Sequence, residues 1–290
     1  MSLNKLFICT VLFLFTIEIF AVDRYWIGTT NNNWNETGNW STTSGGAGGA
    51  SVPIAGDRAL FNSNGNVNLT LDMAPTIGGI DISVGFTATI DLNGNNLTIN
   101  GAINNDFEDG TFNNTSGGAL SITSTATTQL RGTTFNPDIS VTSNRLYLNG
   151  SVYNGTAIFT KNGAGNDVGT GGNTFNGTTS FICSGSGYLM TGNTASDTYN
   201  GALTCTNTGT SGIYLAYNSA GTQFNQNIVV NSTNGLGVRI GQNSNGSATL
   251  AATRTITIGG SGFTAGELRL KDVTLTGATN QNYIATTSGA

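Results

Sequence analysis

Three carboxylates crowd the short segment 106–110 (DFEDG). Carboxylate oxygens bind Ca²⁺, and a pair of carboxyl groups can supply the acid and the base that cleave a glycosidic bond. Asp106, Glu108 and Asp109 are therefore the first candidates for a carbohydrate-active enzyme. Sugar cleavage also needs carboxyls on both sides of the scissile bond or a positioned base, and the sequence shows no such set. A solvated acidic turn is the favoured interpretation.

A second acidic segment, residues 162–169 (NGAGNDVG), partly matches the glycine-rich nonapeptide that binds Ca²⁺ in β-roll proteins. Asp167 occupies the acidic position, but Asn162 replaces the first glycine and Gly169 stands at the apolar strand position. Such a site is shared between successive turns, so a single imperfect copy cannot complete it. We predict an ordinary turn here, and no metal or other cofactor.

The cysteines leave two alternatives. Cys9 belongs to the N-terminal apolar segment, so Cys183 and Cys205 remain, in the same segment of successive repeats. If their rungs are adjacent, their Cα atoms fall within the roughly 4.4–6.8 Å that a disulfide requires. The favoured alternative is two small hydrophobes buried in the core. A catalytic thiol is not expected, because the chain has no His to activate it, and the same absence removes the Ser-His-Asp triad and the usual zinc sites.

Three tyrosines form a candidate ligand face: Tyr147, Tyr214 and Tyr217. Tyr147 and Tyr214 alternate with leucines, so they point outward if the leucines point inward. Exposed tyrosine rings can stack on sugar rings, which makes surface glycans or other envelope components the expected partners. The favoured alternative is that these tyrosines pack on neighbouring rungs and bind nothing.

The elements that would position these residues are repeated. An aromatic followed by Asn recurs at spacings of 23, 18, 22, 24 and 25 residues, near the low end of solenoid periods. The pairs are Phe112-Asn113, Phe135-Asn136, Tyr153-Asn154, Phe175-Asn176, Tyr199-Asn200 and Phe224-Asn225. Two or three short alternating segments and Gly/Ser/Asn turns fill each unit, and no helical period appears.

This pattern predicts an all-β fold, a right-handed parallel β-helix whose coils stack at about 4.8 Å per rung. The aromatics should then stack along the axis, and each Asn should adopt a left-handed turn conformation and join an amide ladder. Residues 22–104, which include Trp26, Trp34 and Trp40, are expected to form an N-terminal β cap and the first coils, because an uncapped first rung exposes an apolar end. Residues 105–290 are the repeats of about 18–25 residues, and we expect them to be truncated at the C-terminus.

Composition and the N-terminal segment indicate what the chain does not bind and where in or outside the cell it works. Only 9% of the residues are charged and the net charge is -5, which excludes a basic nucleic-acid binder. Lys5, the apolar run that follows it and the small residue Ala21 predict a secretory signal peptide over residues 1–21, with an uncleaved anchor as the alternative. The mature chain has no membrane span and is expected to be secreted or held at the cell surface.

The Trp/Asn-rich opening, the pattern P-x-x-x-D-x-x-x-F at Pro53, Asp57 and Phe61, and the T-[FY]-N-G and YLAYN units resemble the N-terminal regions of large secreted surface proteins of the Bacteroidetes. The opening is also similar to the start of autotransporter-type passenger domains. The resemblance implies a parallel β-helix at the cell surface with an adhesin-like role, in a protein whose sorting domain for type IX secretion would lie further along a longer chain.

The expected function is therefore adhesion or envelope interaction by a non-enzymatic β-solenoid, with a polysaccharide lyase or hydrolase as the alternative. An ice-binding solenoid ranks below both. It needs a regular Thr array, and the Thr positions of the sequence wander from unit to unit.

Overall fold

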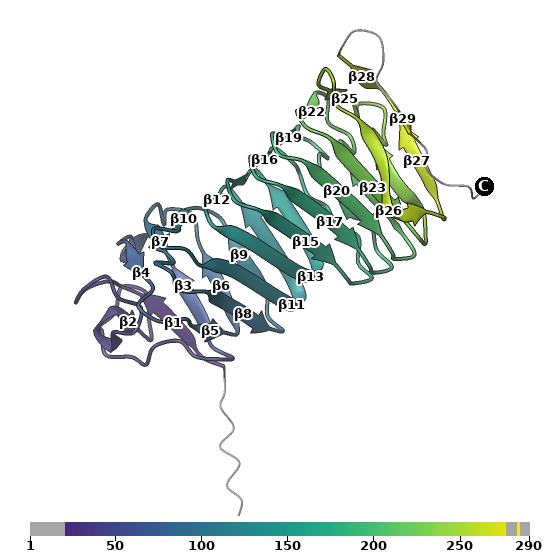
Figure 1. The fold of residues 1–290 in the computed structure, drawn as a ribbon. Helices are drawn as coiled ribbons and strands as arrows, with labels where there is room; N and C mark the ends of the chain where they lie inside the picture. Colours follow the sequence, from purple (N-terminus) through teal and green to yellow (C-terminus); the bar gives the residue numbers. More distant parts are fainter. Residues whose placement is uncertain (1–20, 277–282, 285–290) are drawn as a thin grey trace, which may run out of the picture.

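The computed structural model describes residues 21–276 and 283–284, and these form a parallel β-solenoid of about nine turns. Successive coils stack along one axis, with the N-terminal strands at one end and β26 to β29 at the other (Figure 1). Three sheets run along the described part of the solenoid, with 15, 10 and 4 strands. The predicted all-β parallel β-helix is confirmed.

The first sheet contains the longest strands. Its members are β1 (Asp23–Trp26), β2 (Trp40–Ser41), β3 (Arg58–Phe61), β5 (Thr76–Ile77), β6 (Gly79–Ile82), β8 (Leu97–Gly101), β9 (Asn105–Phe107), β11 (Ala119–Arg131), β13 (Asp138–Asn149), β15 (Ala157–Lys161), β17 (Thr179–Cys183), β20 (Leu203–Asn207), β23 (Ile228–Ser232), β26 (Ile256–Phe263) and β29 (Tyr283–Ile284). Apart from the antiparallel pair of β1 and β2, its strands pair in parallel.

The second sheet carries the aromatic markers, and the third appears only in the later coils. The second contains β4 (Leu69–Thr70), β7 (Thr89–Asp91), β10 (Thr111–Asn113), β12 (Thr134–Phe135), β14 (Val152–Tyr153), β16 (Thr174–Phe175), β19 (Thr198–Tyr199), β22 (Thr222–Phe224), β25 (Ala248–Leu250) and β28 (Val273–Leu275). The third contains β18 (Leu189–Met190), β21 (Gly212–Leu215), β24 (Gly237–Ile240) and β27 (Glu267–Leu270). Two short 3-10 turns, Thr37–Asn39 and Ser63–Gly65, lie near the N-terminus.

The marker aromatics form a continuous column inside the second sheet. Each ring pairs in register with the next, and all six are buried. Ring centroids lie 5.4 Å apart at the start of the column and 4.7 Å apart between Phe175 and Tyr199, with interplanar angles of 14° or less up to that point. The predicted axial stack is thus present, and offset stacking of this kind adds to the burial of apolar area.

The asparagines form the expected amide ladder on the outside. Each Asn side chain donates from Nδ2 to Oδ1 of the Asn one coil earlier, at 2.6–2.8 Å from Asn154 onward and 3.4 Å at Asn136. The predicted left-handed conformation is wrong. The non-glycine residues with positive φ in the described chain are Asn93, Ala216, Thr253 and Asp272, and none belongs to the ladder. The amide needs an extended backbone to reach along the axis.

A threonine column runs beside this ladder, so the expectation that Thr positions wander is wrong for the second sheet. Parallel register aligns nine outward positions, from β7 to β28, and seven of them are Thr. Val152 and Gln223 occupy the other two. Turns of varying length change the spacing between these threonines, but Thr111, Thr134, Thr174 and Thr198 each stand directly before a marker aromatic in the sequence.

The N-terminal end is closed by a tryptophan cluster. Trp26, Trp34 and Trp40 are buried, with ring centroids of Trp34 and Trp40 4.8 Å apart and Phe61 packed against Trp40 at 6.0 Å. The carboxylate of Asp57 accepts from the amides of Val22 and Ile54, both at 3.1 Å. Asp57 and Phe61 of the Pro-Asp-Phe pattern therefore make structural contacts.

The predicted boundary at residue 104 falls inside one coil. Strands β8 and β9 lie on either side of it, and both pair with the single long strand β11. The first sheet continues through this point without interruption. The predicted signal peptide, residues 1–21, lies almost wholly outside the described residues. In the part of the chain that the structure describes, no helix is long and apolar enough to cross a membrane.

One buried corner carries a titrating carboxylate. Asp197 Oδ1 accepts from the backbone N and the side-chain Nδ2 of Asn173, at 2.9 and 2.8 Å, while the amide of Asp197 donates to Thr222 Oγ1 at 3.3 Å. Burial raises the pKa of Asp197 to about 6, and the hydrogen bonds from Asn173 oppose that rise. The folded state is thus favoured most when Asp197 is protonated.

Stability should fall as the pH rises through this value. The folded-state pKa lies above that of an unfolded aspartate, about 3.9, so the folded state binds the proton more tightly. The contribution is complete below pH ~4 and is lost by about one unit above pH 6, with a total on the order of 2–3 kcal/mol. Urea unfolding of the wild type and of Asp197→Asn between pH 4 and 8 would measure it. The free energy of unfolding of the asparagine variant should change less with pH than that of the wild type. An equal change in both proteins would contradict the assignment to Asp197.

Candidate functional site

An aromatic and cationic patch covers the outer face of the third sheet. We define the tyrosine–arginine patch as Tyr188, Tyr214, Tyr217, Arg239 and Arg269. Parallel register places Tyr214 beside Arg239 and Arg239 beside Arg269 on successive strands β21, β24 and β27. The neighbours of Tyr214 in β21 belong to the hydrophobic core, whereas Tyr214 does not, so its ring lies on the outer side of the sheet.

The three tyrosine rings contact one another. Tyr214 lies 5.0 Å from Tyr188 and 6.0 Å from Tyr217, and Tyr188 and Tyr217 are 6.3 Å apart with an interplanar angle of 18°. Tyr214 is buried at 5% exposure by these neighbours, while Tyr188 and Tyr217 keep partial exposure. Burial and the two neighbouring phenols raise the pKa of Tyr188, so it stays a neutral hydroxyl donor.

The two arginines of the patch differ in their partners, because within the described chain only Arg239 contacts an acidic residue. The Arg239 guanidinium lies over the Tyr214 ring, 5.4 Å from its centroid, and its Nε contacts Glu267 Oε1 at 2.8 Å. Arg239 and Arg269 both donate to Gln242 Oε1 at 3.4 Å. Among the described residues Arg269 has no acidic partner, so the patch keeps one uncompensated positive charge.

Packed phenols, with a guanidinium that has no acidic partner among the described residues two strands away, can bind a sugar through its apolar face and its anionic group. Aromatic rings offer a flat surface for the C–H face of a pyranose, and arginine binds carboxylates with directed hydrogen bonds.

The predicted tyrosine face is only partly one site. Tyr214 and Tyr217 come together, but Tyr147 lies in β13 of the first sheet, opposite Gln129, and contacts no other ring among the described residues. Sequence reasoning missed Tyr188, Arg239 and Arg269 as members. The available signal was that Tyr188 and Arg239 occupy the second segment of their repeats, as Tyr214 does.

The acidic segment 106–110 is held in structural contacts. Arg131, from the next coil, pairs with Asp106 at 2.5 Å and also with Glu108. Burial raises the pKa of Asp106, and the hydrogen bond from Arg131 opposes the rise. Asp109 accepts from the amide of Gly85 at 3.1 Å. Sequence reasoning did not foresee that Arg131 would join these carboxylates, because 25 residues separate it from Asp106.

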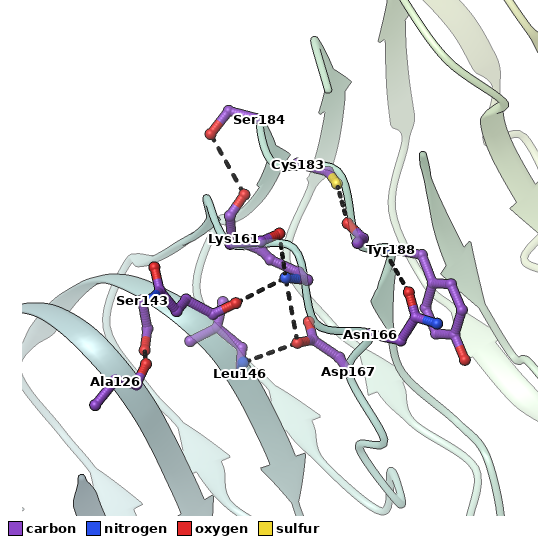
Figure 2. A network of polar contacts seen from close by, with 12 residues as sticks. Ala126, Ser143, Leu146, Lys161, Asn166, Asp167, Cys183, Ser184 and Tyr188 are labelled. Atoms are coloured by element: carbon purple, nitrogen blue, oxygen red, sulfur yellow. Dashed lines mark hydrogen bonds and ion pairs between the residues drawn. The ribbon is translucent and has the colours of Figure 1, made fainter. Parts of the chain in front are cut away.

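The nonapeptide-like segment places its carboxylate inside the coil. Asp167 is fully buried, and its Oδ1 lies 3.9 Å from Lys161 Nζ and accepts from the amide of Leu146 at 2.9 Å (Figure 2). No group of three or more potential metal ligands occurs among the described residues. The turn is therefore occupied by an internal pair of side chains.

The disulfide considered between the two cysteines is not formed. Cys183 and Cys205 are free and buried. The register pairs Cys205 with Phe181 and Cys183 with Asn207, so the thiols are displaced by two residues along adjacent strands. Burial raises the pKa of both thiols, which keeps them protonated. They pack as small hydrophobes, the alternative that the sequence favours.

Comparisons with known proteins add no further identification. No family model matches the chain, and no match was found among the curated proteins or the solved structures.

Proposed function

We propose that this chain is a non-enzymatic, secreted or surface-displayed solenoid that binds acidic glycans of a cell surface or envelope. The observation that carries the proposal is the tyrosine–arginine patch, where three phenols pack on one another and Arg239 separates Tyr214 from Arg269, which has no acidic partner among the described residues. A stiff rod presents such a patch at a fixed position, and several copies on one cell would add weak contacts through multivalency.

The alternative of a polysaccharide lyase or hydrolase has less support. Its candidate carboxylates, Asp106 and Glu108, are both paired with Arg131, and Asp109 binds a backbone amide. Export is also part of the proposal. It is supported by the resemblance to Bacteroidetes surface proteins and by the signal-like segment at the N-terminus.

The patch predicts a specific loss of binding. Tyr217→Ala should weaken the affinity for an acidic oligosaccharide about five-fold, because one aromatic stack contributes about 1 kcal/mol. Arg269→Gln should remove the preference for acidic over matched neutral oligosaccharides. Glycan-array screening followed by calorimetry on the best acidic and neutral pair would measure both effects.

Tyr147→Ala supplies the matched control, since this tyrosine is half-buried on another sheet and has no ring partner among the described residues. It should bind like the wild type. Equal losses in Tyr147→Ala and Tyr217→Ala, or no glycan binding by the wild-type protein, would contradict the proposal.

The threonine column supports a second candidate function, binding to ice. Between β10 and β22 it runs beside the asparagine ladder on a face without ionisable side chains, at the rung repeat of about 4.8 Å. A regular array of hydroxyl, methyl and amide groups can order water in a lattice. Thermal hysteresis in the wild type that is lost in Thr174→Lys would support this function, and its absence in the wild type would end it.

A further inference from the structure

The buried pair inside the segment 161–167 has an arrangement that none of the functions above uses. The side chains of Lys161 and Asp167 are both fully buried, with Nζ 3.9 Å from Oδ1. Lys161 Nζ also donates to the backbone carbonyls of Asn144 at 2.7 Å and Gly163 at 3.0 Å. Figure 2 shows the side-chain nitrogen of Lys161 facing the carboxyl group of Asp167. The pair is therefore held in one geometry from several sides.

The carboxyl group has two different oxygens. Oδ1 accepts from the amide of Leu146 at 2.9 Å, while Oδ2 is buried and has no hydrogen-bond partner among the described residues. A charged carboxylate with one bare oxygen is costly to bury, because desolvation exceeds what a single distant cation returns. A protonated carboxyl with its hydroxyl at Oδ2 suits this environment better.

Burial favours the neutral forms of both groups. It lowers the pKa of Lys161 and raises the pKa of Asp167 well above its usual value, although each partner's charge opposes the shift of the other. A neutral amine has two hydrogens and one lone pair. The carbonyls of Asn144 and Gly163 accept the two hydrogens, which leaves the lone pair for the remaining neighbour, the carboxyl group of Asp167.

We propose that Lys161 and Asp167 condense to an intramolecular isopeptide bond. The Nζ lone pair attacks Cγ, and the negative charge that develops on Oδ1 is stabilised by the Leu146 amide, as in an oxyanion hole. A proton passes from Nζ to the Oδ2 hydroxyl, which leaves as water. The Nζ–Cγ bond forms and the Cγ–Oδ2 bond breaks, so the step needs no oxidant and no cofactor. Nζ lies 3.9 Å from Oδ1, so the two side chains must approach slightly before they reach the separation of about 3–3.5 Å at which oriented groups react with high effective molarity.

The cross-link would lock the coil behind the tyrosine–arginine patch. Asp167 donates its amide to the carbonyl of Tyr188 at 3.1 Å, and Asn166 Oδ1 accepts from the amide of Tyr188 at 3.3 Å. Closing the ring between residues 161 and 167 fixes the strand edge against which Tyr188 lies. The inference does not depend on glycan binding, and its test reads the covalent structure alone.

Mass spectrometry of the purified protein tests the proposal directly. After storage at neutral pH, the intact mass should be lower than the sequence mass by one water, and the fraction converted should increase with time. Trypsin should fail to cleave after the acylated Lys161, and fragmentation of the resulting peptide should give no breaks between residues 161 and 167. An unchanged mass after prolonged storage, with normal cleavage at Lys161, would show a buried ion pair only and would overturn the proposal.

Two comparisons separate the cross-link from other water losses. An aspartate succinimide also loses water, but it leaves Lys161 cleavable and hydrolyses in mild base, whereas an isopeptide bond persists. The pair Lys271 and Asp272, with Nζ 3.3 Å from Oδ2, is an internal control that should stay unmodified because both side chains are open to solvent. Modification of that pair to the same extent would contradict the role of burial.

Variants identify the leaving group. Asp167→Asn should lose one ammonia in place of one water, because the amide nitrogen then occupies the leaving position. Lys161→Met should keep its full sequence mass, since it has no nucleophile at a similar side-chain length. If Lys161→Met fails to fold, the mass of the wild type and of Asp167→Asn still decides the question. A water loss that persists in Lys161→Met would exclude this bond.

Discussion

Phe175→Ala should destabilise the folded protein by about 3–5 kcal/mol, the largest effect we expect from a single side chain. Phe175 lies in the middle of the aromatic column, 4.9 Å from Tyr153 and 4.7 Å from Tyr199 between ring centroids. It also meets Phe181 edge-on at 5.8 Å. Removing the ring leaves a cavity that the rungs on either side cannot fill, because hydrogen bonds fix their spacing. Urea unfolding followed by circular dichroism would measure the loss.

The adjacent ladder residue provides the matched control. Asn176→Ala removes an exposed amide and two ladder hydrogen bonds, to Asn154 and from Asn200. Exposed hydrogen bonds contribute little net stability, so the cost should stay near or below about 1 kcal/mol. If Asn176→Ala proved as damaging as Phe175→Ala, the fold would depend on its outer ladder and not on its core.

Gly201→Ala should cost about 3 kcal/mol, the second-largest effect, for a reason that the T-[FY]-N-G units do not reveal by themselves. Gly201 does not have a positive φ, so backbone conformation does not require glycine here. A methyl group would instead overlap the backbone carbonyl of Gly177 in the coil below, and Gly177 stands in the same relation to Gly155. Since the obstacle is backbone, the coils would have to separate, and overpacking of this kind commonly costs 1–3 kcal/mol or somewhat more. Thermal and urea unfolding would quantify it.

Gly260→Ala is the comparison for this glycine. Gly260 lies in β26, and no atom stands within 4 Å of the position that its Cβ would take. The substitution should change the unfolding free energy by less than about 0.5 kcal/mol. Substituting Gly by Ala lowers the entropy of the unfolded chain and so does not by itself destabilise the fold. A similar loss in both alanine variants would therefore contradict the close approach of coils as the reason for Gly201.

The repeating aromatic–Asn pairs were sufficient to predict the fold, because each pair marks one coil and fixes the register of its neighbours. The column from Phe112 to Phe224 and the amide ladder follow from the same spacing. Thr directly precedes the aromatic in four of the six pairs, so the threonine column is also readable from the sequence, although the many other Thr residues obscure it. Turns of unequal length shift residue numbers between coils, although hydrogen bonding restores the register.

The candidate site was harder to predict, since it depends on contacts between coils. Tyr188 joins Tyr214 only because β18 and β21 are neighbours, and Arg239 reaches the same face one strand later. The partnership of Arg131 with Asp106 arises in the same way. Residues separated by one full coil are adjacent in space, so motifs read along the chain do not reveal these sites.

Distances between spin labels would test the stacking of coils most directly. Labels on cysteines replacing Asn113 and one of the ladder residues Asn136, Asn176 or Asn225 lie one, three or five rungs apart in this register. The separations should increase in proportion to rung number by about 4.8 Å per rung, reaching about 24 Å for the last pair. Distances that do not follow rung number, or that scatter as in an unordered chain, would contradict the stacked-coil structure and the patch built on it.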